Sequence, residues 1–503
     1  MRSLSVFCTF FLTSALLLAQ PAPIDTKAID KIVNGTMKAW KIPGAAVAVV
    51  KNDRVIYVQG YGSKDLTGAE KVTPDTLFQI ASASKAFTTT AMAMLVSDGK
   101  MSWDDPVRKH LEYFRLSDLC ADANVTLRDL VSHRTGMAGH DELWDNSPFT
   151  REEIIRRLAT LPPARSFRSG YRYNNIMFMT AGDAVAAASG MPYDDFVRTR
   201  IFAPLQMTST VIADAEWEKR DHAIGHHYDW RTNRITVQKQ IETTSLGAAG
   251  AIKSSARDMA NWLRFQLSGG AFDLHQLVDP DALNETKTPH TVLRMENLTR
   301  DLNPETNVMS YGMGWQIQDY RGELLVSHSG SLNGFRTRVE LMPKRNSGFV
   351  VMINVDRGIA LVAMRNALAD LLSSKPGRDW HAYYLMVDRK ADEKEDRERQ
   401  EKKARAAKNT QPSRPLDAYA GEYENGPYGT VKVTPVNGGL VLQWSRMTLP
   451  LEHLQYDVFT AYSEWDGVDE NVVFALGEDG SVNKLTIFGE TFTRRNAGVP
   501  PAE

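Results

Sequence analysis

The sequence predicts an α+β fold, in which helices flank an antiparallel sheet and also form a subdomain of their own, followed by a small all-β barrel. Three observations lead to this prediction. The first part of the chain reads as a helix and a hairpin, a long helical middle, several strands and a final helix. Nearly every residue of 388–408 is charged or alanine. Beyond Pro415, short alternating apolar runs are separated by glycine turns.

The composition is that of an ordinary soluble globular protein, with 43% hydrophobic and 24% charged residues. At 503 residues the chain is long enough for more than one domain. Its formal net charge of −2 provides no global positive field, which argues against a dedicated nucleic-acid binder.

The N-terminus has the pattern of a secretory signal peptide at residues 1–19. Arg2 precedes an apolar run at 4–18, and the small residues Ala19 and Ala22 suit cleavage. The run is short for a membrane span, although its retention as an N-terminal anchor is the alternative. We therefore expect a secreted or periplasmic protein after removal of the signal.

One cysteine, Cys120, remains once the signal is removed, because Cys8 lies within the signal. An intramolecular disulfide and a cysteine-based zinc cluster are then both excluded. No later stretch is long and apolar enough to span a bilayer. We therefore expect a mature chain without a membrane span, and we expect no metal or other cofactor.

The first part begins with an amphipathic helix at residues 29–40 and a hairpin with its tight turn at Asn52-Asp53. A closing helix at 361–372 follows several later strands. We expect these strands to pair with the early hairpin and to close one domain over residues 24–375. The predicted late strands are 311–317, 324–330, 335–342 and 348–355, and the helices of the middle are 84–96, 176–189, 193–200 and 255–267.

The tail after Pro415 predicts a small all-β barrel or sandwich over residues 416–496. Runs such as 430–434 and 440–444 have the short alternating pattern of its strands. The charged segment before it, at 388–415, is predicted to be a helical or disordered linker.

Histidines in the helical middle each allow two interpretations. His133, at the end of a short helix within 125–137, could be a general base, but a histidine that caps helix carbonyls is favoured. His222 and His226 have the spacing of a zinc pair on one helical face. Gly225 interrupts that face and no acidic partner is obvious, so loop histidines are favoured over a metal site.

The stretch Ser82-x-x-Lys85 is the first candidate for a catalytic motif. If a helix begins at Ser82, the hydroxyl and the amine lie on one face, about a turn apart. The hydroxyl would also lie where unpaired backbone N–H groups favour negative charge. An attacking serine needs such a basic neighbour, although an ordinary helix N-cap gives the same tetrapeptide.

Acyl transfer needs a nucleophile, a proton acceptor, a proton donor for the leaving group and an oxyanion hole. No Gly-x-Ser-x-Gly elbow and no His-Glu-x-x-His motif occurs, which argues against an α/β-hydrolase and a zinc protease. Three motifs supply the required groups in chain order: Ser82-x-x-Lys85, Tyr173-Asn174-Asn175 and His328-Ser329-Gly330.

Together these motifs resemble those of the serine β-lactamase-like superfamily, which holds class C β-lactamases, D,D-peptidases, D-aminopeptidases and related esterases. They look like its Ser-x-x-Lys, Tyr-x-Asn and Lys/His-x-Gly elements, and the likeness covers roughly residues 28–372. It implies a β-lactamase/transpeptidase-like fold for the hydrolase domain at 24–375. The tail at 416–496 looks like the small, lipocalin-like barrel appended to many such hydrolases. Supporting segments are 127–136, 247–267 and 311–315.

The resemblance implies a role for each residue of the first two motifs. Ser82 would be the nucleophile that forms an acyl-enzyme. Lys85 would either lose its proton and activate Ser82, or stay charged and lower the proton affinity of Tyr173. Tyr173 would carry the proton between Ser82, the leaving group and the incoming water. Asn175 would hold Lys85 and the substrate amide.

The third motif would supply part of the oxyanion hole and a binding surface. The backbone N–H groups of Ser82 and Ser331, the residue that follows Gly330, would form the hole. His328 would face the carboxylate or polar end of the substrate. Taken singly, Tyr173 could be a buried tyrosine with a satisfied hydroxyl and His328 an ordinary strand histidine.

Two departures from the family pattern bear on the substrate. Class C β-lactamases usually carry lysine where His328 stands, and a neutral imidazole binds a β-lactam carboxylate less strongly than a fixed ammonium. Asn174 stands where alanine or serine is commoner. We therefore predict slow β-lactam turnover at best, and an activity of the D,D-peptidase, D-aminopeptidase or esterase type.

The sequence thus predicts an exported serine hydrolase that cleaves a peptide, amide or ester bond in a small-molecule or short-peptide substrate, with cell-wall peptides among the candidates. Two alternatives stay open. One is a catalytically silent sensor domain of the same fold, and the other is a penicillin-binding protein whose acyl-enzyme breaks down slowly. Loops at 138–170 and 270–310 would shape the substrate site, and their sequences do not identify the substrate.

Overall fold

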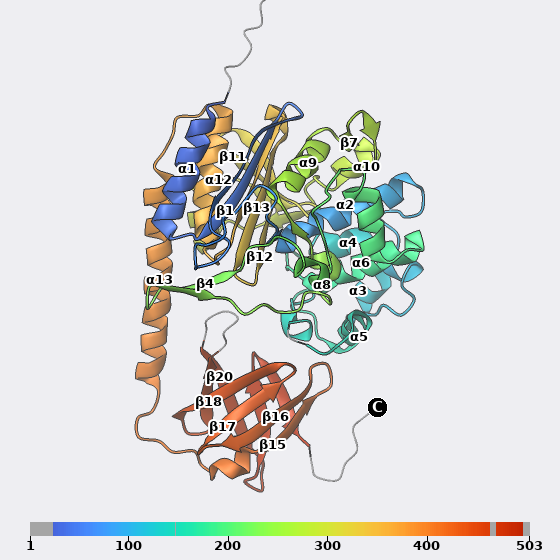
Figure 1. The fold of residues 1–503 in the computed structure, drawn as a ribbon. Helices are drawn as coiled ribbons and strands as arrows, with labels where there is room; N and C mark the ends of the chain where they lie inside the picture. The colour runs from blue at the N-terminus through green and yellow to red at the C-terminus, as the bar shows by residue number, and fades with distance from the viewer. Residues whose placement is uncertain (1–23, 146, 463–468, 496–503) are drawn as a thin grey trace, which may run out of the picture.

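A computed structural model of the chain describes residues 24–145, 147–462 and 469–495, so the predicted signal peptide at 1–19 lies outside the described residues. Figure 1 shows a larger body, in which a sheet lies among helices, and a β-barrel below it, with one long helix running between the two. The prediction of an α+β fold followed by a small all-β barrel is confirmed.

The larger body is built on an eight-stranded antiparallel sheet with the order β2-β1-β14-β13-β12-β11-β10-β9. Its early and late segments meet where β1 pairs with β14, with Val47 opposite Val351, which confirms the predicted closure. Asn52 and Asp53 adopt φ values of 50° and 58°, as a tight hairpin turn requires. The strands are β1 Gly44–Lys51, β2 Arg54–Gly62, β9 Thr291–Leu293, β10 Met309–Tyr311, β11 Gln316–Tyr320, β12 Glu323–Leu332, β13 Phe335–Met342 and β14 Ser347–Ile353.

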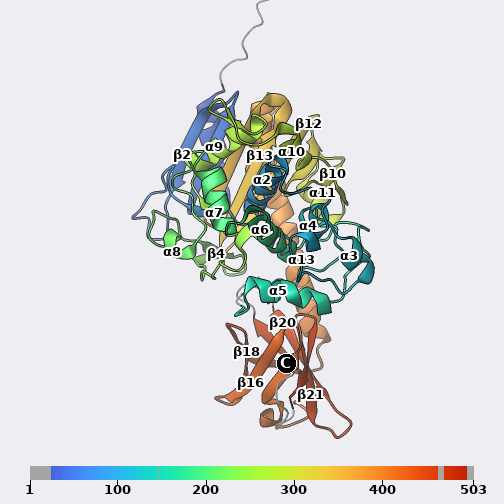
Figure 2. The same cartoon turned by 90° about the vertical axis from the view of Figure 1, so that its right-hand side faces the viewer.

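Helices cover both faces of this sheet (Figures 1 and 2). On one face, α1, α12 and the first half of α13 bury a cluster that includes Trp40, Leu368 and Trp380. On the other face, α9 packs on β1 and β14, and the helical subdomain around α2 and α6 lies beside it. The helices are α1 Thr26–Trp40, α2 Ser84–Ser97, α3 Leu119–Asn124, α4 Leu127–Val131, α5 Arg151–Arg157, α6 Asn175–Ser189, α7 Tyr193–Val197, α8 Asp214–Trp217, α9 Ala256–Leu267, α10 Pro280–Glu285, α11 Asn297–Leu302, α12 Gly358–Ser373 and α13 Trp380–Arg405.

Two local expectations about the elements near the motifs are not met. The helix predicted at 84–96 does begin at Ser84, but the condition that it includes Ser82 is not met, because Ala81–Ala83 forms a tighter 3-10 turn. The single strand expected at 311–317 is interrupted by a turn, where Gly314 has a φ of 74°. This turn packs against α2 so closely that a Cβ on Gly314 would lie 2.9 Å from the carbonyl oxygen of Lys85.

Short two-stranded ribbons complete the larger body. One of them contains His226, so the expectation of a loop histidine is wrong for this residue. No described helix has both the length and the apolar character needed to cross a membrane. The ribbons pair β3 Phe78–Gln79 with β6 Lys253–Ser254, β4 His226–Asp229 with β5 Arg234–Val237, and β7 Ala271–Phe272 with β8 His275–Gln276.

The C-terminal strands form a closed barrel in which β15 pairs with β22. Its interior is filled by apolar and aromatic side chains, among them Trp444, Phe459 and Phe474. The predicted linker at 388–415 is helical as far as Arg405, because α13 continues into it. The barrel strands are β15 Gly421–Asn425, β16 Gly429–Val436, β17 Gly439–Trp444, β18 Met447–Gln455, β19 Val458–Tyr462, β20 Asp469–Leu476, β21 Val482–Ile487 and β22 Glu490–Arg494.

Candidate active site

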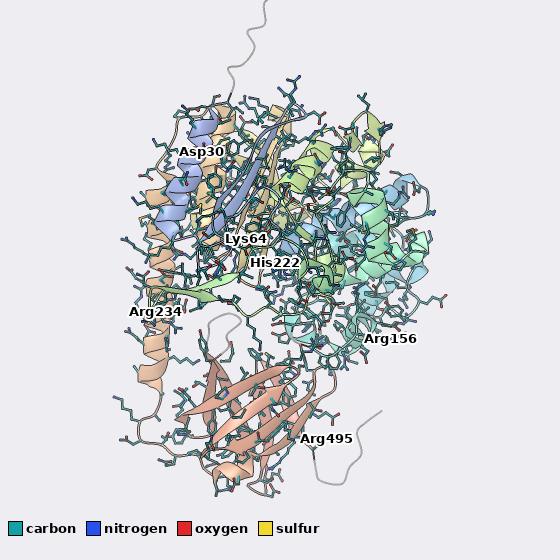
Figure 3. The ribbon with its side chains drawn as sticks, viewed as in Figure 1. Asp30, Lys64, Arg156, His222, Arg234 and Arg495 are labelled. Atoms are coloured by element: carbon teal, nitrogen blue, oxygen red, sulfur yellow. The ribbon has the colours of Figure 1, made fainter. Side chains whose placement is uncertain are left out.

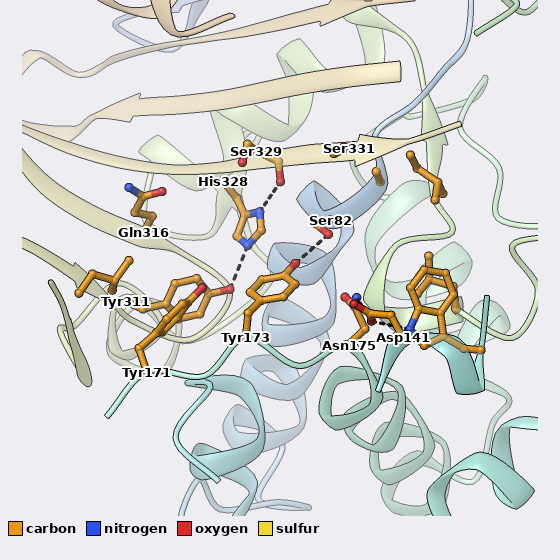
Figure 4. A pocket seen from close by; sticks show the side chains of 15 residues that line it. Ser82, Asp141, Tyr171, Tyr173, Asn175, Tyr311, Gln316, His328, Ser329 and Ser331 are labelled. Carbon is orange, nitrogen blue, oxygen red and sulfur yellow. Dashed lines mark hydrogen bonds between the residues drawn. The ribbon is translucent and has the colours of Figure 1, made fainter. Parts of the chain in front are cut away.

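A pocket of about 330 Å³ opens where β12 passes the start of α2, and it brings the three sequence motifs together (Figure 4). Of the predicted site residues, Lys85 lies directly behind Ser82, and Gly330 lies between two strand residues that line the pocket. The lining residues are Ala81, Ser82, Asp141, Trp144, Tyr171, Tyr173, Asn175, Leu246, Leu293, Tyr311, Gln316, His328, Ser329, Ser331 and Leu332.

Ser82 stands on a turn that the sheet approaches very closely. A Cβ on Gly330 would lie 2.0 Å from the carbonyl oxygen of Ile80, so glycine is required for β12 to come this near. This contact fixes the position of the third motif relative to the first. Ser82 and Ser331 consequently line the same pocket, and the oxyanion hole between them stays a prediction.

Lys85 is fully buried, and its side-chain nitrogen has three oxygen partners. Nζ lies 3.1 Å from Ser82 Oγ, 2.7 Å from Asn175 Oδ1 and 2.7 Å from the carbonyl oxygen of Ala249. Burial lowers the pKa of Lys85 to about 7, because the ammonium loses its hydration, and the nearby Asp141 carboxylate acts in the opposite direction. A neutral amine has two N–H groups for the two carbonyl oxygens, which leaves its lone pair for the serine hydroxyl.

Tyr173 contacts the same hydroxyl. Its OH donates to Ser82 Oγ at 2.8 Å (Figure 4). Burial raises the pKa of Tyr173 above its ordinary value, because a phenolate would be poorly solvated there, while the bond to Ser82 acts in the opposite direction. Tyr173 is therefore a neutral phenol, which can donate a proton within the pocket.

Asn175 links Lys85 to a carboxylate in the pocket wall. It is the first residue of α6, which is capped by the Asn174 side chain. Asn175 Oδ1 accepts from Lys85, and its Nδ2 donates to Asp141 Oδ1 at 2.9 Å. Trp144 Nε1 donates to the same carboxylate oxygen at 2.7 Å. The Asp141 carboxylate is thus held by side chains from two segments.

His328 is neutral and has a partner on each ring nitrogen. Nδ1 lies 2.6 Å from the carbonyl oxygen of Ser329, and Nε2 lies 2.9 Å from the Tyr311 hydroxyl. Because a carbonyl can only accept, Nδ1 carries the proton and Nε2 accepts from Tyr311. Burial, with a smaller effect of Lys85, lowers the pKa of His328 to about 3. The predicted contact with a substrate carboxylate would require one of these bonds to be given up, and it stays a prediction.

His133 lies among the aromatic rings behind the pocket. Its ring centroid is 4.3 Å from that of Tyr173 and 4.8 Å from that of Tyr311. Nδ1 accepts from the backbone N–H of Asn174 at 3.1 Å, so the expectation that His133 caps helix carbonyls is wrong. The left-handed φ of 56° at His133 turns the chain away from α4, which allows the ring to reach the second motif. Burial lowers the pKa of this histidine well below its ordinary value.

Sequence reasoning did not assign a role to several lining residues. It placed Asp141 in a loop that borders a cleft and noted the segment of Tyr311, but no pattern connected them with Ser82. Trp144, Tyr171 and Gln316 carried no signal, because only the fold brings their three segments to the pocket. Among the described residues, no three side chains of the types that bind metals gather at one point.

Comparisons with protein families agree with the geometry. The family model described as Beta-lactamase matches residues 29–374, which is more than half of the chain. A second family model, described as a domain of unknown function (DUF3471), matches residues 405–497 and so includes the barrel.

Individual relatives are distant. The unguisins hydrolase ungD' of Aspergillus campestris is 29% identical over 435 residues, which cover 81% of this chain and 77% of the relative. Protein flp of Staphylococcus aureus is 26% identical over 65% of this chain and 63% of its own length. The solved structure of the octameric penicillin-binding protein homologue from Pyrococcus abyssi matches with a TM-score of 0.60 at 23% identity, over 93% of this chain and 99% of that one. That likeness shows a shared fold.

Proposed function

The chain belongs to the Beta-lactamase family, and from this premise we propose that it is an exported serine hydrolase that cleaves a peptide, amide or ester bond through an acyl-enzyme on Ser82. One observation carries the proposal. Ser82 Oγ lies 3.1 Å from Lys85 Nζ and 2.8 Å from the Tyr173 hydroxyl. Acyl transfer requires a nucleophile with a base and a proton donor in such reach. The hydrolase name of the fungal relative supports the same reaction class.

In acylation, neutral Lys85 takes the proton of Ser82 while Oγ attacks the acyl carbon. With a pKa of about 7, about half of Lys85 is neutral at pH 7, and the amine is still basic enough to accept the proton. Asn175 Oδ1 and the carbonyl oxygen of Ala249 then accept from the ammonium that forms. The negative charge that develops on the acyl oxygen would be stabilised by the backbone N–H groups of Ser82 and Ser331.

Tyr173 completes the proton transfers. When the tetrahedral intermediate collapses, the Tyr173 hydroxyl gives its proton to the leaving group, and the Lys85 ammonium returns a proton to the phenolate. In deacylation the same groups act in reverse order. Tyr173 passes its proton to Lys85 and takes one from the water that attacks the ester. The Lys85 ammonium then returns a proton to Ser82 Oγ as the acid leaves. No proton is gained or lost by the enzyme over the cycle.

The charge of His328 affects which substrates the pocket can bind. Because its ring is neutral and engaged by Tyr311 and by the backbone of Ser329, it offers no positive charge to a β-lactam carboxylate. We therefore expect slow β-lactam hydrolysis at best, and D,D-peptidase, D-aminopeptidase or esterase activity instead. Rapid cephalosporin hydrolysis by the purified enzyme would contradict this part of the proposal.

The test is an acyl substrate panel run on the wild type and on Ser82→Ala. The panel contains p-nitrophenyl esters, amino-acid amides, D-Ala-D-Ala peptides and nitrocefin. We expect turnover of at least one non-lactam class and its loss in the variant. A fluorophosphonate probe that labels both proteins equally, or neither, would favour a silent sensor domain. A stable fluorescent-penicillin adduct that requires Ser82 would favour a slowly deacylating penicillin-binding protein.

Export is tested separately. The signal pattern at residues 1–19 predicts that the mature protein begins after Ala19 or Ala22. N-terminal sequencing of protein from the medium or the periplasm would identify the cleavage site. An intact N-terminus on a membrane-bound fraction would favour a retained anchor.

A further inference from the structure

Asp141 is the one formally charged side chain among the described residues that line the catalytic pocket. The buried histidines His328 and His133 both have lowered pKa values, so neither brings a positive charge at neutral pH. Lys85 lies behind Ser82, does not line the pocket, and with a pKa of about 7 carries at most part of a charge at neutral pH. The wall that a substrate meets therefore has a net negative charge.

The Asp141 carboxylate is fixed in place but not neutralised. Its two hydrogen-bond donors, Asn175 Nδ2 and Trp144 Nε1, are uncharged and share one oxygen, Oδ1. No arginine or lysine of the described chain forms a salt bridge with it, and the residue is exposed to the pocket. Two hydrogen-bonded side chains, Asn175 and Lys85, connect it to Ser82 Oγ. A held, solvent-facing carboxylate beside a nucleophile can bind a cation.

We propose that Asp141 binds an ammonium group of the substrate, so that the pocket prefers acyl compounds with a free amine near the scissile bond. This proposal rests on the Ser82 chemistry proposed above and deepens it by naming a substrate class. Substrates with a carboxylate at the same place meet like charge, which lowers their affinity. Neutral substrates meet neither effect and provide the reference.

The experiment compares alanine p-nitroanilide, in both enantiomers, with the lactoyl compound in which a hydroxyl replaces the ammonium. We expect wild type to prefer the amine by at least ~10-fold in kcat/KM, as the loss of a charge-assisted hydrogen bond implies. In Asp141→Asn this preference ratio should fall to about 1. Glu142→Gln removes the neighbouring carboxylate, which does not line the pocket, and should leave the ratio as in wild type.

Each outcome separates the two proposals. An equal fall of both rates in Asp141→Asn, with the ratio unchanged, would mean that Asp141 only positions Asn175 and would overturn the inference. A wild-type ratio near 1 would overturn it as well. In both cases Ser82-dependent hydrolysis would survive, whereas activity that persists in Ser82→Ala would remove the proposed function itself.

A second inference rests on a different observation, the contact between the barrel and the loop that contains Asp141. The Tyr428 hydroxyl of the barrel lies 2.6 Å from His140 Nδ1 and donates to Glu490 Oε1 at 3.0 Å. Since this hydroxyl has one proton, His140 Nδ1 must be the donor in the first bond. Arg157 adds bonds to the carbonyl oxygens of Gly426 and Pro427 at 3.0 and 2.6 Å.

We infer that the barrel acts as a clamp on residues 138–145, and that it contributes to the active site by holding this loop from outside. His140 adopts a left-handed φ of 47°, a conformation that a non-glycine residue keeps only when its surroundings hold it. The adjacent residue, Asp141, lies in the pocket wall. Tyr428 is thus a positioning residue that acts through His140.

Tyr428→Phe in the full-length protein tests the clamp. Tyr423→Phe is the matched control, because its hydroxyl donates to the carbonyl oxygen of Tyr419 inside the barrel at 2.8 Å. We expect Tyr428→Phe to speed amide hydrogen exchange in 138–145 by ~2–10-fold and to raise KM by a similar factor, with kcat within about twofold. Neither change should occur in the control.

Two results would overturn the clamp. One is an unchanged exchange rate and KM in Tyr428→Phe, and the other is an equal change in Tyr423→Phe, which would point to loss of barrel stability. If Tyr428→Phe does not fold, His140→Ala removes the same bond from the other side and is judged by the same two measurements.

Discussion

The protein contains two eight-stranded antiparallel structures that use their strands in opposite ways. The barrel closes on itself, and its interior is filled by rings such as Phe459 and Phe474, whose centroids lie 5.6 Å apart. The open sheet of the larger body leaves a polar cavity beside β12 instead. Both are well packed, but the cavity beside β12 brings Ser82, Tyr173 and His328 together at one place.

The difference shows where chemistry is possible. Around the pocket, Lys85, His133 and His328 are buried, and each has a pKa far from its ordinary value. In the barrel, burial also raises the pKa of Tyr423, but its hydroxyl donates to the carbonyl oxygen of Tyr419 among packed side chains and does not line the pocket. Perturbed titrating groups in a cavity mark a functional site, and a filled apolar interior marks a structural one. We therefore expect any effect of the barrel on the pocket to come from its outer surface.

The largest effect that the comparison predicts is at Lys85. Lys85→Met should lower kcat/KM for a p-nitrophenyl ester by ~10³–10⁴-fold, because the proposed general base is lost. Lys287→Met is a matched control: burial lowers the pKa of Lys287 to about 7 as well, but this lysine bonds the carbonyl oxygen of Gln266 and does not line the pocket. An equal loss in the control would mean that burial of a lysine, rather than its contact with Ser82, controls activity.

The next effect concerns the barrel core. Phe474→Ala should destabilise the barrel by ~3–5 kcal/mol, because it removes a buried ring that packs on Tyr419, Tyr423 and Phe459. Thermal unfolding followed by calorimetry measures the loss. At temperatures where the barrel stays folded, kcat should remain within about twofold of the wild-type value, since the ring is remote from Ser82. A collapse of kcat without a stability change would contradict the division between a structural and a catalytic region.

How far the sequence predicts this molecule depends on the range of each interaction. The hairpin turn at Asn52-Asp53, the closure of the sheet and the barrel follow from local patterns and from strand pairing, and they agree with the structure. Whether Ser82 belongs to the helix that begins at Ser84 could not be decided from the sequence. The 3-10 turn before it is fixed by the close approach of Gly330 to Ile80, a contact between segments far apart in the chain.

The candidate site shows the same limit. Short motifs identified Ser82, Lys85 and Tyr173 because their spacing carries the signal, and the structure brings them within hydrogen-bonding distance. Roles for Asp141 and Tyr311 could not be predicted from the sequence. Their hydrogen bonds to Asn175 and His328 become visible only when the side chains are placed in the fold. Tautomers and pKa values depend on burial and so require the fold.

A smaller effect is expected at Tyr173. Tyr173→Phe should lower kcat/KM by ~10²-fold, since the ring stays but the proton carrier is lost. The loss should be larger for an amide than for a p-nitrophenyl ester, because an amine leaving group needs a proton and a p-nitrophenolate does not. Steady-state kinetics on both substrates gives this comparison directly. Equal losses would mean that Tyr173 positions Ser82 and does not supply the leaving-group proton.

The smallest effect is a shift in the pH profile. Lys85 acts as a base only when neutral, so kcat/KM should rise with pH through the Lys85 pKa of about 7. The Asp141 carboxylate favours the ammonium form and therefore raises this pKa. Asp141→Asn removes that charge, and the acid limb should move to lower pH by up to ~1 unit. The profile is measured with a neutral ester, so that the substrate does not titrate.

The direction of this shift tests whether the charge of Asp141 influences the protonation of Lys85. Lys85 and Asp141 are both hydrogen-bonded to Asn175, so a shift to lower pH would show that the charge of Asp141 affects the protonation of the proposed base. Glu142→Gln, which alters the neighbouring carboxylate, should leave the limb in place because Glu142 is not among the groups that shift the Lys85 pKa. A limb that stays fixed in Asp141→Asn would show that burial alone sets the basicity of Lys85, and a move to higher pH would contradict the electrostatic effect expected of Asp141. In that case the two regions would be coupled through the shape of the pocket and not through its charge.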